Sequence, residues 1–151
     1  MPEVCLVAHN IRSAENVGSL FRTADALGVA KIWIAGYTPG PEHPKARKTA
    51  LGAEKSVSWE RATDVPRLLA ELRAAGFRLV GLELDPRAAP LQDYRSAAEK
   101  IALVLGNEVE GVPPWVRDTC DDLVFIPQRG VKESLNVTIA AAIATYALLI
   151  K

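Results

Sequence analysis

A polar loop around an asparagine and an arginine is the first part of this sequence whose residue types could bind a ligand. Residues 9–24 read HNIRSAENVGSLFRTA. Asn16 is placed to cap a helix, since its side-chain oxygen can accept a free N–H of the first turn. Arg22 lies one helical turn beyond Gly18, which leaves room for a close approach to that face. The alternative is a surface ion pair between Arg22 and Asp25, three residues further on.

Two more polar loops follow short apolar runs. Residues 105–114 (LGNEVEGVPP) form a tight loop whose backbone groups can face a ligand. Residues 126–137 (IPQRGVKESLNV) lead from an expected strand end to a helix start, where backbone donors are free. Asn136 falls in the first turn of an apolar helix, so its amide should bond to another loop. The alternatives are an ordinary turn for the first loop and a helix cap without a ligand for the second.

A fourth segment is basic. Residues 43–48 read HPKARK, with three basic residues and no acidic one, in a loop flanked by proline. Such a patch can contact the phosphates of a nucleic acid. The alternative is a loop of solvated charges with no partner.

The apolar pattern predicts an α/β fold that positions these loops. The expected strands are residues 4–8, 31–35, 77–84, 101–105 and 123–126. The expected helices are residues 16–27, a helix from Asp64 to a stop at Gly76, and a last helix capped by Ser134 that runs nearly to Lys151. Residues 36–44 are expected to be an irregular loop. Alternating strands and helices indicate a mostly parallel sheet with helices on both faces, whose ligands lie beyond the carboxyl strand ends, after residues 8, 84, 105 and 126.

Composition excludes several classes of protein. The 151 residues suit one domain, and 18 basic and 18 acidic residues cancel, which argues against a strongly basic nucleic-acid coat. Cys5 and Cys120 form no CxxC pair, which suits a reducing, cytoplasmic setting. The apolar run 137–150 is shorter than the roughly 20 residues that a bilayer needs. The sequence lacks GxGxxG, GxxxxGK[ST], HExxH and GxSxG, and His9 and His43 have no metal-ligand spacing.

Taken together, the loops resemble the three motifs of the SpoU/TrmH family of RNA ribose 2′-O-methyltransferases, within the SPOUT superfamily. The matching segments are NVGSLFRTADALGV (16–29), LVLGNEVEGVP (103–113) and IPQRGVKESLNVTIAAAI (126–143). KTALGAEK (48–55) is similar to a further segment of the family. The motifs occur in the order and spacing of the family and cover nearly the whole chain. One departure is Gln128-Arg129, where many relatives have Met followed by a varied residue.

The resemblance implies S-adenosylmethionine as methyl donor and a SPOUT-type α/β fold with a C-terminal trefoil knot. It also implies a homodimer with its active sites at the subunit interface. We expect a single domain over residues 1–151 with no added RNA-binding domain, no metal and no membrane partner. The implied catalytic residues are Arg22, Asn16, Glu108 and Asn136. The implied cofactor-binding residues are Leu82, Gly106, Ile126, Ser134 and Leu135. The RNA-binding candidates are Arg12, Lys45, Arg47 and Lys48.

The resemblance implies methyl transfer to a ribose 2′-hydroxyl, with tRNA as the first expected substrate and rRNA as the second. Arg22 is expected to stabilise negative charge at the 2′-oxygen. Two alternatives stay open. One is a non-catalytic RNA-binding relative of the same fold, and the other is a methyltransferase of the same fold that acts on a base or on a small molecule.

Overall fold

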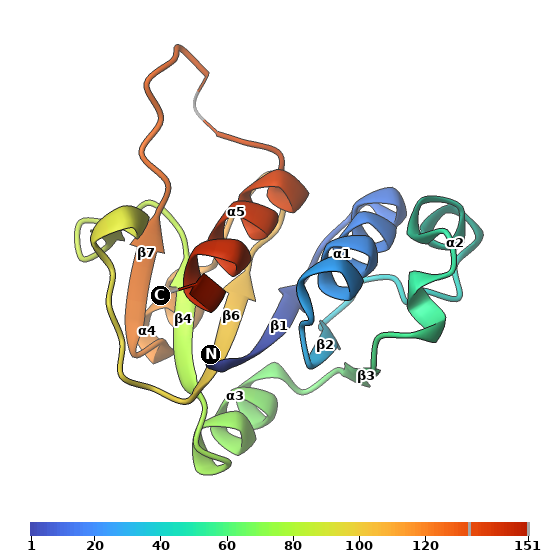
Figure 1. Cartoon of the computed structure of the whole chain (residues 1–151), viewed down its shortest axis with the longest axis horizontal. Coiled ribbons are helices and arrows are strands. Elements are labelled where there is room, and N and C mark those ends of the chain that lie inside the picture. The colour runs from blue at the N-terminus through green and yellow to red at the C-terminus, as the bar shows by residue number, and fades with distance from the viewer. Residues whose placement is uncertain (133, 151) are drawn as a thin grey trace.

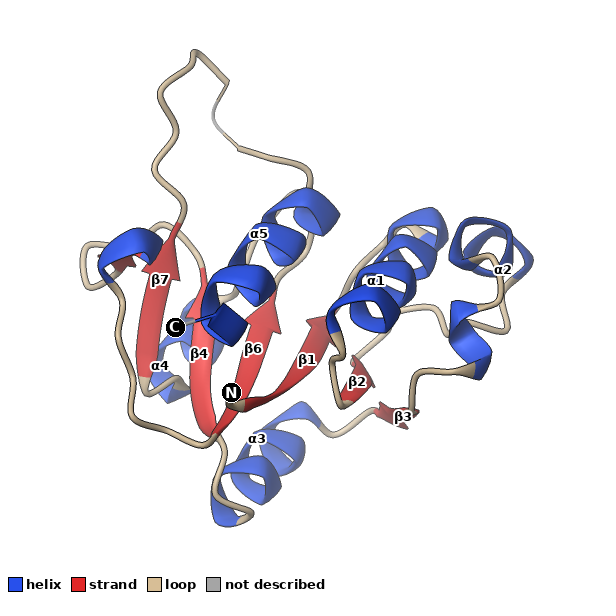
Figure 2. Cartoon of the chain, viewed as in Figure 1, coloured by secondary structure: helices blue, strands red, loops and turns tan. Residues whose placement is uncertain are grey.

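Seven parallel strands form one sheet in the computed structural model, which describes residues 1–132 and 134–150. The strand order is β3-β2-β1-β6-β4-β7-β5 (Figures 1 and 2). The strands are β1 (Glu3–His9), β2 (Lys31–Ala35), β3 (Trp59–Ala62), β4 (Arg78–Leu82), β5 (Ala89–Pro90), β6 (Lys100–Leu105) and β7 (Asp122–Phe125). Every pair is parallel, so the predicted α/β fold is confirmed. The trefoil knot stays a prediction.

Helices cover both faces of the sheet. They are α1 (Ala14–Leu27), α2 (Pro44–Ala50), α3 (Val65–Ala74), α4 (Pro114–Thr119) and α5 (Val137–Ile150), with short 3-10 turns η1 (Ala53–Lys55) and η2 (Leu91–Asp93). Helices α1 and α5 pack on one face, with α2 on the far side of α1, and α3 and α4 pack on the other (Figure 1).

Strand β1 shows why the strands are apolar throughout. Its side chains alternate between the faces: Leu6 and Ala8 contact the layer of α1 and α5, while Cys5 and Val7 contact the layer of α3 and α4. Both sets are buried, as is typical of a parallel sheet between two helical layers.

The predicted cap of the first helix is wrong by one turn. Helix α1 begins at Ala14, and the Ser13 hydroxyl accepts the N–H of Asn16 at 3.2 Å. Ser13 is therefore the N-cap, in the extended conformation typical of that position. The side chain of Asn16 is thus free for a contact outside the helix.

The last helix also begins later than predicted. Helix α5 starts at Val137, and the side-chain oxygen of Asn136 accepts the N–H of Thr138 at 2.8 Å. Asn136 is therefore the cap, and the expected cap at Ser134 is wrong. No helix in the described ranges is long and apolar enough to cross a membrane.

Several elements had no prediction, among them the short strands β3 and β5 and helix α2 in the basic segment. Pro44 occupies the first turn of α2, and Nδ1 of His43 accepts the N–H of Lys45 at 3.1 Å. Gly18 allows α2 to pack closely on α1, because a Cβ at that position would lie 2.2 Å from the carbonyl oxygen of Ala46. The close approach inferred at Gly18 is therefore made by α2 and not by a ligand.

Candidate active site

A cavity of about 580 Å³ lies at the carboxyl edge of the sheet, next to the start of α5. The ends of β4, β6 and β7 and the segment before α5 form its walls. A cavity of this size suits a small-molecule ligand. The loops expected to hold a ligand after β4, β6 and β7 are therefore the loops that form it.

All the cofactor candidates line this cavity: Leu82, Gly106, Ile126, Ser134 and Leu135. They are distant in sequence and meet only because β4, β6 and β7 end at the same edge. Their role stays a prediction, but their placement is what cofactor binding requires. No cluster of His, Cys, Asp or Glu suited to a metal ion occurs in the part of the chain that the structure describes.

The loop after β6 folds back tightly on itself. The N–H of Gly111 donates to the carbonyl of Asn107 at 2.9 Å, and the N–H of Asn107 donates back to Gly111 at 3.2 Å. A Cβ at position 106 would lie 2.2 Å from the carbonyl carbon of Gly111 and from the nitrogen of Val112. Gly106 is thus required by the return of the loop, which forms one wall of the cavity.

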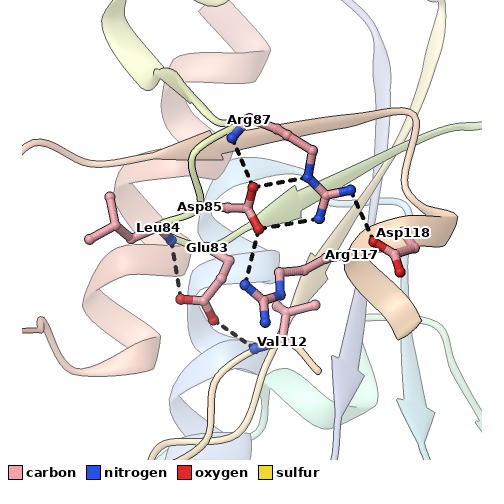
Figure 3. A network of polar contacts seen from close by, with 7 residues as sticks. All are labelled: Glu83, Leu84, Asp85, Arg87, Val112, Arg117 and Asp118. Atoms are coloured by element: carbon pink, nitrogen blue, oxygen red, sulfur yellow. Dashed lines mark hydrogen bonds and ion pairs between the residues drawn. The ribbon is translucent and has the colours of Figure 1, made fainter. Parts of the chain in front are cut away.

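Glu83 supports this loop from the neighbouring loop, directly after β4. Its Oε1 accepts the N–H of Val112 at 2.7 Å, and its side chain lines the cavity (Figure 3). The expected strand over residues 77–84 placed Glu83 inside a strand. Strand β4 ends at Leu82 instead, so Glu83 belongs to the loop and was missed as a site residue.

Asp85 ties the loop after β4 to helix α4 (Figure 3). Its carboxylate accepts N–H bonds from Arg87 Nε at 3.0 Å and from Arg117 Nη1 at 3.0 Å. Arg87 also pairs with Asp118 of α4 at 2.9 Å. The hydrogen bonds from the side chain and backbone N–H of Arg87 lower the pKa of Asp85 to about 2. The network holds one wall of the cavity in place.

Glu108 joins the loop after β6 to the start of α1. Its carboxylate accepts the backbone N–H groups of Arg12 at 2.8 Å and Ser13 at 2.9 Å, and the side-chain amide of Asn16 at 2.9 Å. Partial burial raises the pKa of this carboxyl, but the N–H donors outweigh it and the net pKa is lowered. Glu108 is therefore ionised at neutral pH.

Asn16 connects this carboxylate to the last helix. Its side-chain oxygen accepts an N–H from Asn136 at 3.4 Å, so Glu108, Asn16 and Asn136 form one hydrogen-bonded chain. Asn136 thus bonds to another segment as expected, but it is exposed and its partner lies in helix α1, not in a loop. Three of the four catalytic candidates are thus adjacent, although 92 and 120 positions in sequence separate the bonded pairs.

Arg22, the fourth candidate, stands apart. It is exposed on α1, six residues beyond Asn16, and does not line the cavity. The alternative ion pair with Asp25 does not occur in the described structure. Asp25 instead accepts a hydrogen bond from the Ser56 hydroxyl at 2.8 Å. The guanidinium of Arg22 is therefore available for an external partner.

The RNA-binding candidates fall into two groups. Arg12 is exposed beside the Glu108 contact, whereas Lys45, Arg47 and Lys48 are exposed on α2. Helix α1 lies between α2 and α5 (Figure 1), and no residue of α2 lines the cavity. The basic residues of α2 are therefore not part of the cavity of the same chain.

Residues 3–146 match the SpoU rRNA Methylase family. The chain belongs to this family. Its family membership, proposed above from three motifs, is thereby confirmed.

Relatives with assigned names are longer than this chain. The chain is 35% identical over 142 residues to a 23S rRNA (guanosine-2′-O-)-methyltransferase RlmB of Acinetobacter baylyi, covering 93% of this chain and 57% of that protein. The enzyme of the same name from Bordetella pertussis is 33% identical over 145 residues, covering 96% of this chain and 58% of that protein. The chain therefore spans a little over half the length of these relatives.

Solved structures of the family share the fold. An AdoMet-bound rRNA methyltransferase from Sinorhizobium meliloti superposes with a TM-score of 0.90 at 28% identity, covering 96% of this chain and 55% of that one. The SpoU methyltransferase AviRb from Streptomyces viridochromogenes, in complex with AdoMet, superposes with a TM-score of 0.83 at 30% identity. The match covers 99% of this chain and 57% of that one.

Proposed function

We propose that this protein transfers a methyl group from S-adenosylmethionine to a ribose 2′-hydroxyl of RNA. The observation that carries the proposal is the chain of Glu108, Asn16 and Asn136 beside a cavity of about 580 Å³. The names of the relatives support it, since they describe guanosine-2′-O-methyltransferases and AdoMet-bound family members.

The cavity fits the cofactor in size and in chemistry. Its volume lies in the range of sites for ligands of this size, and its lining combines apolar residues with polar residues of the loops after β4, β6 and β7. The five lining residues named above would hold the cofactor, whose sulfonium supplies an electrophilic methyl group. Glu83 and Glu108 add negative charge to the wall, which suits a cationic ligand.

Glu108 and Asn136 act as positioning groups in this proposal. Glu108 fixes the loop after β6 against α1, and Asn136 fixes the segment before α5 against the same helix. Because these contacts fix the loops relative to one another, they place the 2′-hydroxyl next to the methyl group. Such orientation is worth several kcal/mol of barrier.

Arg22 stabilises the negative charge that develops on the 2′-oxygen or on the adjacent phosphate. A guanidinium holds its proton firmly and is a poor general base, so this electrostatic role suits it better. Arg22 does not line the cavity of its own chain. The proposal therefore includes a homodimer, in which a partner chain can complete the site.

Ribosomal RNA is the substrate that we propose. The expectation of tRNA as first choice is not supported, because the curated relatives described above are named for 23S rRNA. Exposed basic residues on α2 and in the loop at Arg12 supply phosphate contacts. A cytoplasmic location belongs to the same proposal and suits the two free thiols.

Mapping of 2′-O-methyl groups tests the function directly. Ribosomal RNA from a strain that lacks the gene should lose one ribose methylation that the parent carries, and the purified protein should restore it. Replacing the target nucleotide by its 2′-deoxy form should abolish transfer. RNA binding without any methyl transfer would favour the non-catalytic alternative, and methylation of the deoxy substrate would move the acceptor to the base.

A further inference from the structure

Tyr37 is an exposed aromatic residue whose backbone N–H and side-chain hydroxyl both form hydrogen bonds. It is 60% exposed and follows strand β2. Its backbone N–H donates to the side-chain oxygen of Asn10 at 3.0 Å, and its hydroxyl accepts an N–H from Asn107 at 2.8 Å. The ring is therefore oriented although much of it faces solvent.

The hydrogen bonds place this ring across the carboxyl end of β1. Tyr37 follows β2 and Asn107 follows β6, and β1 lies between these two strands in the sheet. Asn107 also donates to the carbonyl of Asn10, directly after β1, at 2.9 Å. Because Asn107 lines the cavity and precedes Glu108, the ring lies at the rim of the candidate active site.

The backbone around Tyr37 adopts unusual conformations to hold it. Asn10 has a φ of 55° and Gly36 a φ of 63°, both in the left-handed region. A Cβ at position 36 would lie 2.0 Å from the side-chain oxygen of Asn10, so only glycine admits this contact. The buried Thr38 hydroxyl anchors the turn by accepting the N–H of Ile11 at 2.9 Å. Local strain of this kind clusters at functional sites.

We propose that the Tyr37 ring is a stacking platform for an unpaired RNA base next to the nucleotide that is methylated. The inference rests on the proposed function for its substrate class. An oriented ring loses little conformational freedom when a base stacks on it, and every base offers a flat face. The side chains bonded to Tyr37, Asn10 and Asn107, are polar, which suits a base and phosphate better than an apolar protein surface.

RNA affinity, measured separately from methyl transfer, tests this inference. Binding of transcribed 23S rRNA is measured in the presence of S-adenosylhomocysteine for the wild type, Tyr37→Phe and Tyr37→Ala. We expect Tyr37→Ala to weaken RNA binding about tenfold, the scale of one lost stacking contact. Tyr37→Phe keeps the ring but loses the bond to Asn107, so its RNA affinity should lie between those of the wild type and Tyr37→Ala. Affinity for S-adenosylhomocysteine should be the same in all three.

Trp59→Ala is the matched control, because Trp59 is a partly exposed aromatic residue at the start of β3. It lies at the amino end of the strands, whereas Tyr37 lies beyond their carboxyl ends. The Trp59→Ala variant should bind RNA normally. The inference is overturned if Tyr37→Ala binds RNA as the wild type does, if Tyr37→Phe is as weak as Tyr37→Ala, or if the substitution changes the oligomeric state. A wild type that binds RNA without methylating it would refute the proposed activity alone, provided that Tyr37→Ala still weakens binding.

Discussion

At the scale of single residues, the candidate site is a set of side chains that each link two segments. Glu108 joins the loop after β6 to α1 by accepting hydrogen bonds from Arg12 and Asn16. Asn16 in turn accepts a hydrogen bond from Asn136, before α5. Such a chain holds three loops in one arrangement with few groups. Arg22 is outside this chain, so its role can be separated from the positioning of the loops.

Arg22→Ala should lower turnover about a hundredfold while changing the free energy of unfolding by well under 1 kcal/mol. The side chain is exposed and makes no pair with Asp25, so little packing is lost. Single-turnover kinetics and urea unfolding measure the two effects. Arg67→Ala, which removes another exposed helical arginine from α3, is the control and should keep full activity. Normal turnover in Arg22→Ala would make Arg22 an ordinary surface residue.

Acid should weaken the protein through Asp85. The folded-state pKa of this carboxyl is about 2, below the ordinary value of 3.8, because Arg87 and Arg117 bind its charged form. Its ionised form therefore stabilises the fold above about pH 4, and this contribution is lost as the pH falls toward about 2. Asp85→Asn should be less stable than the wild type at pH 6, with the difference in urea midpoint shrinking toward pH 2. A difference that stays constant across this range, or that the exposed control Asp93→Asn reproduces, would contradict the assignment.

At the scale of elements, the loop after β6 is the part of the site that tolerates least change. The loop closes between Asn107 and Gly111, and Glu83 supports it from the loop after β4. Gly106 fits only because it has no side chain. A larger residue at position 106 would clash with the loop itself, at Gly111 and Val112.

Gly106→Val should weaken binding of S-adenosylhomocysteine at least about tenfold and lower the free energy of unfolding by about 1–3 kcal/mol. The added Cβ would lie 2.2 Å from backbone atoms of Gly111 and Val112, so the loop must move away from its place in the cavity wall. Calorimetry and urea unfolding give the two values. Gly130→Ala is the control, since a Cβ there meets nothing within 4 Å. Wild-type affinity in Gly106→Val would show that the loop does not shape the cofactor site.

At the scale of the whole molecule, helix α5 presents an apolar stripe to solvent. Ile139, Ile143, Tyr146 and Ile150 are 53%, 42%, 55% and 62% exposed. Their spacing of four, three and four residues puts them on one face of the helix. The opposite face packs into the core through residues such as Ala141 and Leu148. Apolar patches of this kind mark interaction sites, and a second copy of the chain is the partner that we expect.

Light scattering should therefore give about twice the 16.3 kDa of one chain. Ile143→Glu should shift the protein toward monomer, because it places a charge in the middle of the stripe. Methyl transfer should fall with the dimer if Arg22 acts across the interface. Leu51→Glu changes an exposed leucine that is 69% accessible at the end of α2, and it should leave the dimer intact. A wild type of monomer mass at micromolar concentration would rule out the proposed assembly.

The sequence by itself determined the fold class and the edge of the sheet where the site lies. The sequence located β1, β2 and β6 because each is an unbroken apolar run between polar loops, and α1 and α3 because their apolar residues recur at helical spacing. Three motifs identified the family. Two short, polar elements were missed, since α2 resembles a basic loop in sequence and β3 has no strand pattern. Packing of α2 on α1 and pairing of β3 with β2 stabilise these elements, and local sequence preference does not.

The tertiary structure alone decided how the polar residues are used. Asn16 looks like a helix cap in sequence, yet Ser13 caps α1 and leaves Asn16 to bond Glu108, 92 positions away. Asn136 takes the capping role expected of Ser134. Hydrogen bonds between distant segments depend on which strand ends meet at the same edge of the sheet. That arrangement follows from the strand order, which no local pattern in the chain encodes.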